Sequence, residues 1–193
     1  MSFVSVVACQ SFITVMSDGL VKDLETGKVL DTKYPKHKKI SSKQFIAYSG
    51  IKEYCEHITD HFSFTDDMYN LSEIANQIFQ IINVGDFSRH NLHFSVGGVD
   101  INGEIAFYTI KNKNGEGVRQ YRPTNNALQC AFHESGQFKK KISLLDKLTE
   151  YLRKTEPIDS KKCLMAQKRL NDLVAMHDPT VNKKTFSIEI NID

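Results

Sequence analysis

Two side chains near the start of the sequence have the chemistry of amide cleavage. Ser2 carries a hydroxyl and Asp18 a carboxylate, and two β-rich runs, 3–9 and 12–17, lie between them. A short polar tip separates the runs, which predicts a β-hairpin that brings Ser2 opposite Asp18 or Gly19. If the initiator methionine is removed, Ser2 also gains a free α-amine, whose pKa of roughly 8 makes it a base within reach of its own hydroxyl. These groups predict a serine nucleophile at the open end of the hairpin.

This serine needs partners, because a serine hydroxyl is a weak nucleophile unless a base removes its proton. A lysine held beside Ser2 by Asp18 would favour the neutral α-amine and would stabilise the oxyanion that develops during attack. The reaction would be acyl transfer, in which an amide is attacked, an ester with the enzyme forms, and water hydrolyses that ester. The predicted substrate is therefore a peptide or another amide.

The composition is that of an ordinary globular protein and excludes several other classes. The chain has 193 residues, of which 40% are hydrophobic and 25% charged, with a formal net charge of +2. Short basic runs at 36–39 and 139–141 are typical of solvated faces, so we expect no nucleic-acid partner. No run approaches the roughly 18 apolar residues of a membrane span. Residues 1–20 lack the basic start of a secretory signal.

The cysteines and histidines predict neither a disulfide framework nor a metal centre. The four cysteines are widely spaced and form no Cys-x-x-Cys motif, which indicates reduced thiols in a cytoplasmic protein. His57 and His61 have the i, i+4 spacing of a helical metal pair, but no His-Glu-x-x-His motif or third ligand accompanies them. A structural or exposed pair is the favoured interpretation, and we expect no cofactor.

The predicted elements follow the order strands, two helices, strands, two helices, strand. Apolar stripes with helical spacing mark 51–62, 71–82, 142–152 and 160–174. Because strands and helices do not alternate one by one, a parallel doubly wound sheet is disfavoured. The first strand is apolar on both faces, so we expect an α+β fold with two antiparallel sheets stacked face to face and a helix pair outside each, a four-layer αββα sandwich. We predict one domain spanning residues 1–193.

Six short motifs follow one another along the chain, starting at the end of the hairpin. They are Asp18-Gly19, Lys39-Ile40, Ser49-Gly50-Ile51, Gly97-Gly98-Val99-Asp100, Glu134-Ser135-Gly136 and His177-Asp178. In this order and near-spacing the sequence resembles proteasome β-type subunits and bacterial HslV peptidases, which are N-terminal nucleophile (Ntn) hydrolases. The resemblance covers essentially the whole chain and implies the same four-layer fold.

The resemblance implies roles for the groups around Ser2. Relatives use the first residue of the mature chain as the nucleophile, usually a threonine, and Ser2 has that place here. Asp18 matches the aspartate that supports a neighbouring lysine. Lys39, just before a hydrophobic residue that opens the next strand, matches that lysine best, with Lys38 as the alternative. Removal of the initiator methionine by an aminopeptidase would expose Ser2.

Three further residues match the rest of the family's site. Gly50 matches the glycine whose N–H donates to the oxyanion. Ser135 matches the serine of a Gly-Ser-Gly-like turn, and Asp178 matches an aspartate that follows the last helix. The implied activity is that of a peptidase or amidohydrolase, and a homo-oligomer is expected because relatives assemble.

Two other functions remain open at the level of the sequence. A non-catalytic member of the same fold would serve as a structural or assembly subunit, as α-type proteasome subunits do. An amidase for a small substrate would work as a monomer or dimer. Retention of the initiator methionine would favour the structural role, because it blocks the α-amine of Ser2.

Overall fold

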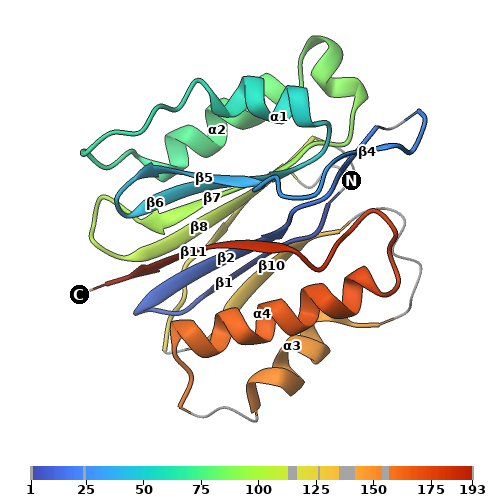
Figure 1. Cartoon of the computed structure of the whole chain (residues 1–193). Helices are drawn as coiled ribbons and strands as arrows, with labels where there is room; N and C mark the ends of the chain where they lie inside the picture. The colour runs from blue at the N-terminus through green and yellow to red at the C-terminus, as the bar shows by residue number, and fades with distance from the viewer. Residues whose placement is uncertain are drawn as a thin grey trace.

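The computed structural model of the protein describes residues 2–23, 25–112, 117–125, 127–134, 142–153 and 157–192. Within these ranges the chain folds into two main antiparallel sheets with helices on their outer faces (Figure 1), which confirms the predicted α+β class. The first sheet contains, in spatial order, β10 (Gln129–His133), β1 (Val4–Ala8), β2 (Phe12–Asp18) and β11 (Thr185–Asn191).

The second sheet has five strands whose spatial order is the same as their order in the sequence. It contains β5 (His37–Ser41), β6 (Gln44–Ser49), β7 (His93–Val99), β8 (Ile105–Lys111) and β9 (Gly117–Tyr121). A separate two-stranded ribbon follows β2 in the chain. Its strands are β3 (Val21–Lys22) and β4 (Val29–Asp31).

Helices cover the outer face of each sheet. α1 (Lys52–Thr59) and α2 (Leu71–Ile82) pack on the five-stranded sheet, and a short 3-10 helix, η1 (Gly85–Arg89), follows them. α3 (Leu144–Arg153) and α4 (Ser160–Ala175) pack on the four-stranded sheet. None of the helices in the described ranges has the length and apolarity needed to cross a lipid bilayer.

Polar side chains determine where two of these helices begin. Asn70 accepts a hydrogen bond from the N–H of Ser72 at 3.1 Å and so caps α2. Asp159 accepts one from the N–H of Lys162 at 2.8 Å and caps α4. Such side chains satisfy N–H groups of the first turn that have no partner within the helix, which is why these sequences start helices at these points.

The apolar character of β1 on both faces has a direct structural reason. One face, with Val4, packs against Phe45 of β6 and Phe107 of β8 in the core between the two sheets. The other face, with Val7, packs in a cluster with Phe3 and the apolar sides of α3 and α4. All five residues of β1 are buried. The strand that follows Ser2 is therefore fixed from both sides.

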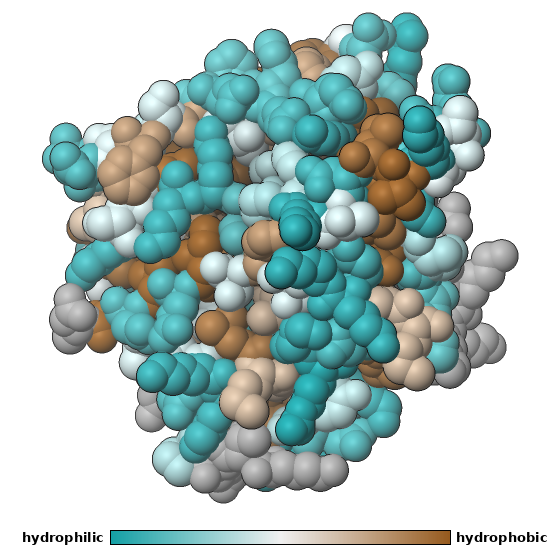
Figure 2. All heavy atoms as spheres, viewed as in Figure 1, coloured by the Kyte–Doolittle hydropathy of each residue, from teal (hydrophilic) through white to brown (hydrophobic). Residues whose placement is uncertain are grey.

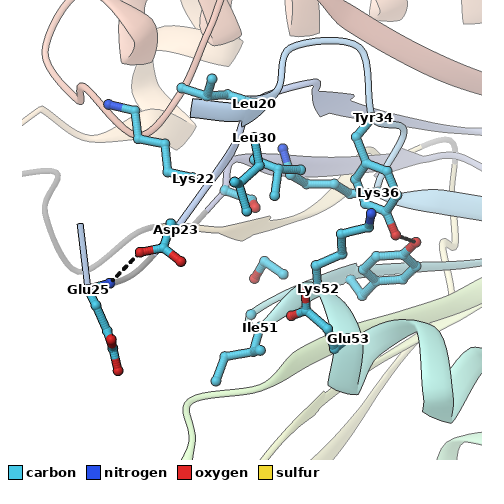
Figure 3. Close-up of a pocket in the computed structure, with 15 residues that line it drawn as sticks. Leu20, Lys22, Asp23, Glu25, Leu30, Tyr34, Lys36, Ile51, Lys52 and Glu53 are labelled. Carbon is cyan, nitrogen blue, oxygen red and sulfur yellow. Dashed lines mark hydrogen bonds between the residues drawn. The ribbon is translucent and has the colours of Figure 1, made fainter. Parts of the chain in front are cut away.

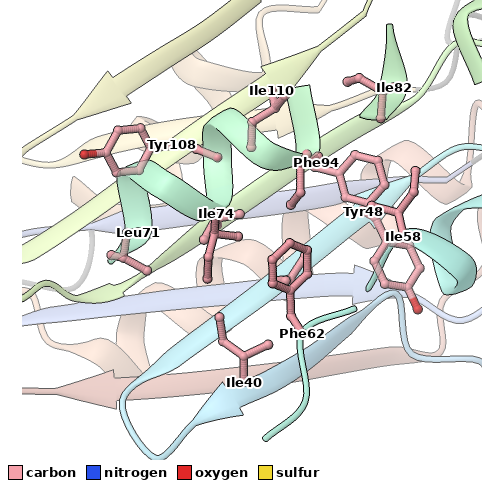
Figure 4. Close-up of a cluster of buried hydrophobic side chains, with 14 of the residues drawn as sticks. Ile40, Tyr48, Ile58, Phe62, Leu71, Ile74, Ile82, Phe94, Tyr108 and Ile110 are labelled. Atoms are coloured by element: carbon pink, nitrogen blue, oxygen red, sulfur yellow. The ribbon is translucent and has the colours of Figure 1, made fainter. Parts of the chain in front are cut away.

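A further cluster of buried side chains joins α1 and α2 to the five-stranded sheet (Figure 4). Ile58 of α1 and Ile74 of α2 meet Phe94 and Ile110 of the sheet, with Phe62 beside them. The outer surface differs sharply from this interior. The face in Figure 2 is mostly hydrophilic, with apolar residues in separate patches.

A buried polar network fixes α4 on the four-stranded sheet. The side chain of Gln167 accepts a hydrogen bond from Thr14 Oγ1 at 2.8 Å and donates one to the backbone oxygen of Ser5 at 2.9 Å. All three residues are fully buried. Because water cannot replace a lost partner at this depth, each polar atom depends on the others.

Replacing Gln167 with Leu should lower the free energy of unfolding by about 1–3 kcal/mol, because Thr14 and Ser5 would each lose a hydrogen bond to Gln167 at a fully buried site. Denaturant titration measures this change. Gln77→Leu, at an exposed position of α2, is the matched control and should change the value by less than about 0.5 kcal/mol. A Gln167→Leu variant as stable as the parent would show that the network contributes nothing.

Candidate functional site

The opening hairpin holds Ser2 at its open end, as the sequence predicted. β1 and β2 pair with Val4 opposite Ser17, and the next pair is Phe3 and Asp18, where the Asp18 N–H donates to the Phe3 carbonyl at 3.1 Å. Asp18 Oδ1 accepts from the Phe3 N–H at 2.9 Å. Ser2 is therefore the first residue beyond the Phe3–Asp18 pair, and it is buried.

Asp18 forms a buried ion pair with Lys36. Asp18 Oδ2 lies 2.8 Å from Lys36 Nζ, and the two side chains are 0% and 5% exposed. The same ammonium donates to the Asp18 backbone oxygen at 2.9 Å, while Oδ2 also accepts from the N–H of Leu20 at 2.8 Å. Burial lowers the pKa of Lys36, and the Asp18 carboxylate opposes that shift. The pair is thus a fixed charge arrangement next to Ser2.

The backbone around Lys36 attaches it to both sheets. Its N–H donates to Ser17 Oγ at 3.1 Å, and its carbonyl accepts from the N–H of Tyr48 at 2.9 Å. Ser17 belongs to β2 and Tyr48 to β6. The segment before β5 is held between these strands, and its lysine reaches Asp18 from there.

The structure corrects one sequence-based assignment: the lysine held by Asp18 is Lys36, neither Lys39 nor Lys38. Lys39 lies in β5 and is exposed. Lys38 Nζ lies 3.6 Å from Asp60 Oδ1 in a partly exposed ion pair. β5 begins one residue after Lys36, so the buried lysine lies before the strand. The assignment to Lys39 had relied instead on a lysine directly before the hydrophobic residue Ile40. We expected the basic run at 36–39 to lie on a solvated face, but the Lys36 side chain is buried.

Gly50 follows β6 in a conformation that favours glycine. Its φ is 147°, and a Cβ at this position would lie 2.7 Å from Leu92 Cδ2. Any other residue would strain the backbone and clash with its neighbour. Gly50 lines the same pocket as Ser2 and Lys36.

One pocket of about 220 Å³ contains these three groups (Figure 3). Ser2 enters it from the start of β1, Lys36 from the segment before β5, and Gly50 from the end of β6. The β3–β4 ribbon, the first turn of α1 and the residues Tyr34 and Tyr48 supply most of the remaining walls. A serine, a lysine and a backbone amide from three separate segments thus line one partly enclosed space, and these are the types of group that nucleophilic attack on a carbonyl requires.

Two predicted site residues have a different status. Ser135 lies outside the residues that the structure describes. Asp178 is fully buried in the turn after α4, where its Oδ1 accepts from the N–H of Thr180 at 2.8 Å and from Thr180 Oγ1 at 2.6 Å. Asp178 is not among the described residues that line the pocket.

His57 and His61, which have the spacing of a metal pair, lie in a small aromatic cluster. Their rings meet edge to face with centroids 5.4 Å apart, and His57 stacks on Phe87 at 5.9 Å. Across the described ranges, no group of three or more His, Cys, Asp or Glu side chains is arranged to hold a metal ion.

A second histidine pair is buried between the sheets. His93 lies opposite Ser49 in the five-stranded sheet, and His133 lies opposite Val4 in the other. Their rings stack with centroids 3.6 Å apart, and Ser95 Oγ lies 2.8 Å from His133 Nε2. Burial lowers the pKa of His133 to about 3 and that of His93 well below its ordinary value. Both rings are therefore neutral at pH 7.

The buried pair predicts that the protein loses stability as the pH falls below about 6.5, because unfolded histidines bind protons that the buried ones do not. Each of these two histidines should lower the free energy of unfolding by about 1 kcal/mol at pH 5.5 relative to pH 7.5. Urea titrations at the two pH values measure the difference. His133→Gln should reduce it, whereas His61→Gln, at an exposed position, should not. An unchanged pH dependence in His133→Gln would contradict this prediction.

Substitution of lysine by methionine should affect stability very differently at Lys36 and at Lys39. Lys36→Met leaves the Asp18 carboxylate buried without its cation and should lower the free energy of unfolding by about 3–5 kcal/mol. Lys39→Met changes only an exposed side chain of β5 and should cost less than about 0.5 kcal/mol. Denaturant titration of both variants compares them directly. Equal stability of the two variants would refute the importance of the ion pair.

Comparison with known proteins identifies the fold but no sequence family. No protein-family model matches the sequence, and no curated protein matches it. Among solved structures, the chain is similar to the crystal structure of eukaryotic HslV from Trypanosoma brucei, with a TM-score of 0.65 and 13% sequence identity. The match covers 98% of this chain and 99% of that chain. The resemblance is thereby confirmed at the level of the fold: the chain has the fold of HslV, a proteasome-like Ntn hydrolase.

Proposed function

We propose that the chain is a proteasome-like Ntn hydrolase that cleaves an amide with Ser2. The observation that carries the proposal is the buried Asp18–Lys36 ion pair, which lies next to Ser2 and whose lysine shares a pocket with Ser2 and Gly50. A fixed, buried ammonium stabilises negative charge better than a solvated one. Its lowered pKa also makes Lys36 better suited to proton transfer. The HslV-like fold supports the same function.

The proposed reaction begins after the initiator methionine has been removed. The neutral α-amine of Ser2 takes the proton of Oγ while Oγ forms a bond to the carbonyl carbon of the substrate. The carbonyl becomes an oxyanion, to which the N–H of Gly50 donates. The C–N bond then breaks, and the α-ammonium gives its proton to the leaving amine. Water, deprotonated by the same amine, hydrolyses the ester and restores the Ser2 hydroxyl.

Lys36 and Asp18 control the charge around this amine. The Lys36 ammonium disfavours protonation of a neighbouring amine, which keeps the base of Ser2 neutral near pH 7. Asp18 fixes Lys36 through its carboxylate and its backbone oxygen. Because Asp18 also binds the N–H of Phe3, one residue positions both the lysine and the strand that carries the nucleophile.

We extend the proposal to the finer features that the resemblance implies. The two sheets and their helices form a four-layer αββα sandwich, and residues 1–193 form one domain. The protein works in the cytoplasm as a homo-oligomer, and Ser135 and Asp178 complete the site. The match to HslV over 98% of the chain supports these features.

A non-catalytic subunit of the same fold is the second candidate. The bonds of Asp18 and Lys36 also join β1, β2 and the segment before β5. The fold would therefore need this ion pair even if Ser2 performed no chemistry.

Covalent labelling of Ser2 distinguishes the two candidates. Protein whose intact mass shows Ser2 as its first residue should gain the mass of one peptide vinyl sulfone, because the probe traps an activated nucleophile. Ser2→Ala should gain none. Ser11→Ala, at the exposed tip of the same hairpin, is the control and should react like the parent. An unlabelled mature protein, or equal labelling of Ser2→Ala, would favour the structural subunit.

A further inference from the structure

The pocket beside Ser2 has the size of a single side chain. Its volume is about 220 Å³, which is below the roughly 300–1,000 Å³ of sites that enclose a whole small molecule. When Ser2 Oγ attacks a carbonyl, the residue that carries this carbonyl lies directly against Ser2. The side chain of that residue is the group that the pocket receives, so the lining selects among substrates.

Much of the pocket wall is apolar. Leu20 lies between β2 and β3, Val21 in β3 and Leu30 in β4, and Ile51 is the residue before α1. In Figure 3, Leu20 and Leu30 lie above the hollow and Ile51 lies below it. Such walls suit a long side chain that buries a methylene stem and keeps a polar end near water.

The lysines of the pocket are engaged or point elsewhere. Lys36 Nζ is held in its ion pair. Lys52 Nζ lies 4.7 Å from the centre of the Tyr34 ring and 3.8 Å from Glu56 Oε1. Lys22 extends away from the hollow in Figure 3. An acidic side chain that entered the pocket would have to compete with these existing contacts.

Two tyrosine hydroxyls of the lining offer acceptors rather than donors. The Tyr34 hydroxyl donates to Glu56 Oε1 at 2.8 Å, which uses its only proton. The hydroxyls of Tyr34 and Tyr48 are 2.9 Å apart, so Tyr48 must be the donor in that contact. Burial raises the pKa of Tyr48 to about 12 and raises that of Tyr34 as well, so both keep their protons. Only oxygen lone pairs remain for a ligand.

Two carboxylates lie on opposite sides of the hollow. Asp23, just after β3, and Glu53, in the first turn of α1, both line the pocket, and Figure 3 shows them on opposite sides of it. Asp23 Oδ1 accepts from the Thr26 hydroxyl and N–H and from the Glu25 N–H. The hydrogen bonds from Thr26 lower the pKa of Asp23, so this carboxylate remains ionised at neutral pH.

We propose that this pocket binds a lysine or arginine side chain, so that the protein cleaves amides on the carbonyl side of basic residues. The inference rests on the proposed function, because the Ser2 reaction defines which side chain enters. The apolar walls take the methylene stem, while Asp23 and Glu53 pair with the cationic end. A leucine side chain would forgo these polar contacts, and an aspartate side chain would meet like charge.

A matched set of fluorogenic peptides tests the specificity. The mature protein is given peptidyl aminocoumarin amides that differ only in the residue before the scissile bond, which is Lys, Arg, Leu or Asp. We expect kcat/KM for Lys and Arg to exceed that for Leu by about tenfold or more, with Asp lowest. Equal or higher values for Leu or Asp would overturn the inference.

Charge-neutralising variants assign the preference to the two carboxylates. Glu53→Gln and Asp23→Asn should each lower the ratio of Lys to Leu kcat/KM by about threefold to tenfold, because each removes one charge near the cationic end. Glu150→Gln, on α3, is the control and should keep the ratio of the parent. A ratio unchanged in both pocket variants would contradict the assignment.

Labelling of Ser2 in the same preparations separates the inference from the proposed function. Protein that reacts with the vinyl sulfone but prefers Leu would retain the proposed hydrolase function and lose the basic specificity. Protein that neither reacts nor cleaves any peptide would lose both.

Discussion

A lysine ammonium buried against a carboxylate is the interaction on which the Ser2 end of the molecule depends. Moving either ion out of water costs several kcal/mol, and their attraction offsets this only when geometry and further hydrogen bonds are favourable. Asp18 meets that condition with bonds to Lys36, Phe3 and Leu20. The pair can therefore form only when β1, β2 and the segment before β5 are all in place. Folding and the proposed chemistry have the same requirement.

The pocket combines charges of opposite sign at different places. The Lys36 ammonium is buried beside Ser2, where an attacked carbonyl would develop negative charge. The carboxylates of Asp23 and Glu53 lie on the walls, where a basic side chain would end. An extended substrate can satisfy both only in one orientation, with its carbonyl toward Ser2 and its cation toward the walls. These charges would thus help the apolar walls to orient a basic peptide for attack.

The sequence predicted those parts of the structure that depend on local patterns. The pairing of the hairpin around Asp18 and the order of strands and helices follow from the polar hairpin tip and from apolar periodicity. β9 was not predicted, because it is a partly exposed strand at the edge of its sheet and lacks a clear alternation. Which lysine of the run 36–39 is buried also could not be predicted. Its choice depends on Ser17 and Tyr48, which approach only in the folded chain.

The most direct measurement is a crystal structure of the mature protein, with Ser2 as its first residue, bound to a peptide boronate. We predict a covalent bond between Ser2 Oγ and boron and a boronate oxygen within hydrogen-bond distance of the Gly50 N–H. Lys36 Nζ should lie about 3 Å from Ser2 Oγ while it still binds Asp18. A boronate bound to another residue, or a Lys36 side chain directed away from Ser2 in the complex, would contradict the proposed role of the buried ion pair.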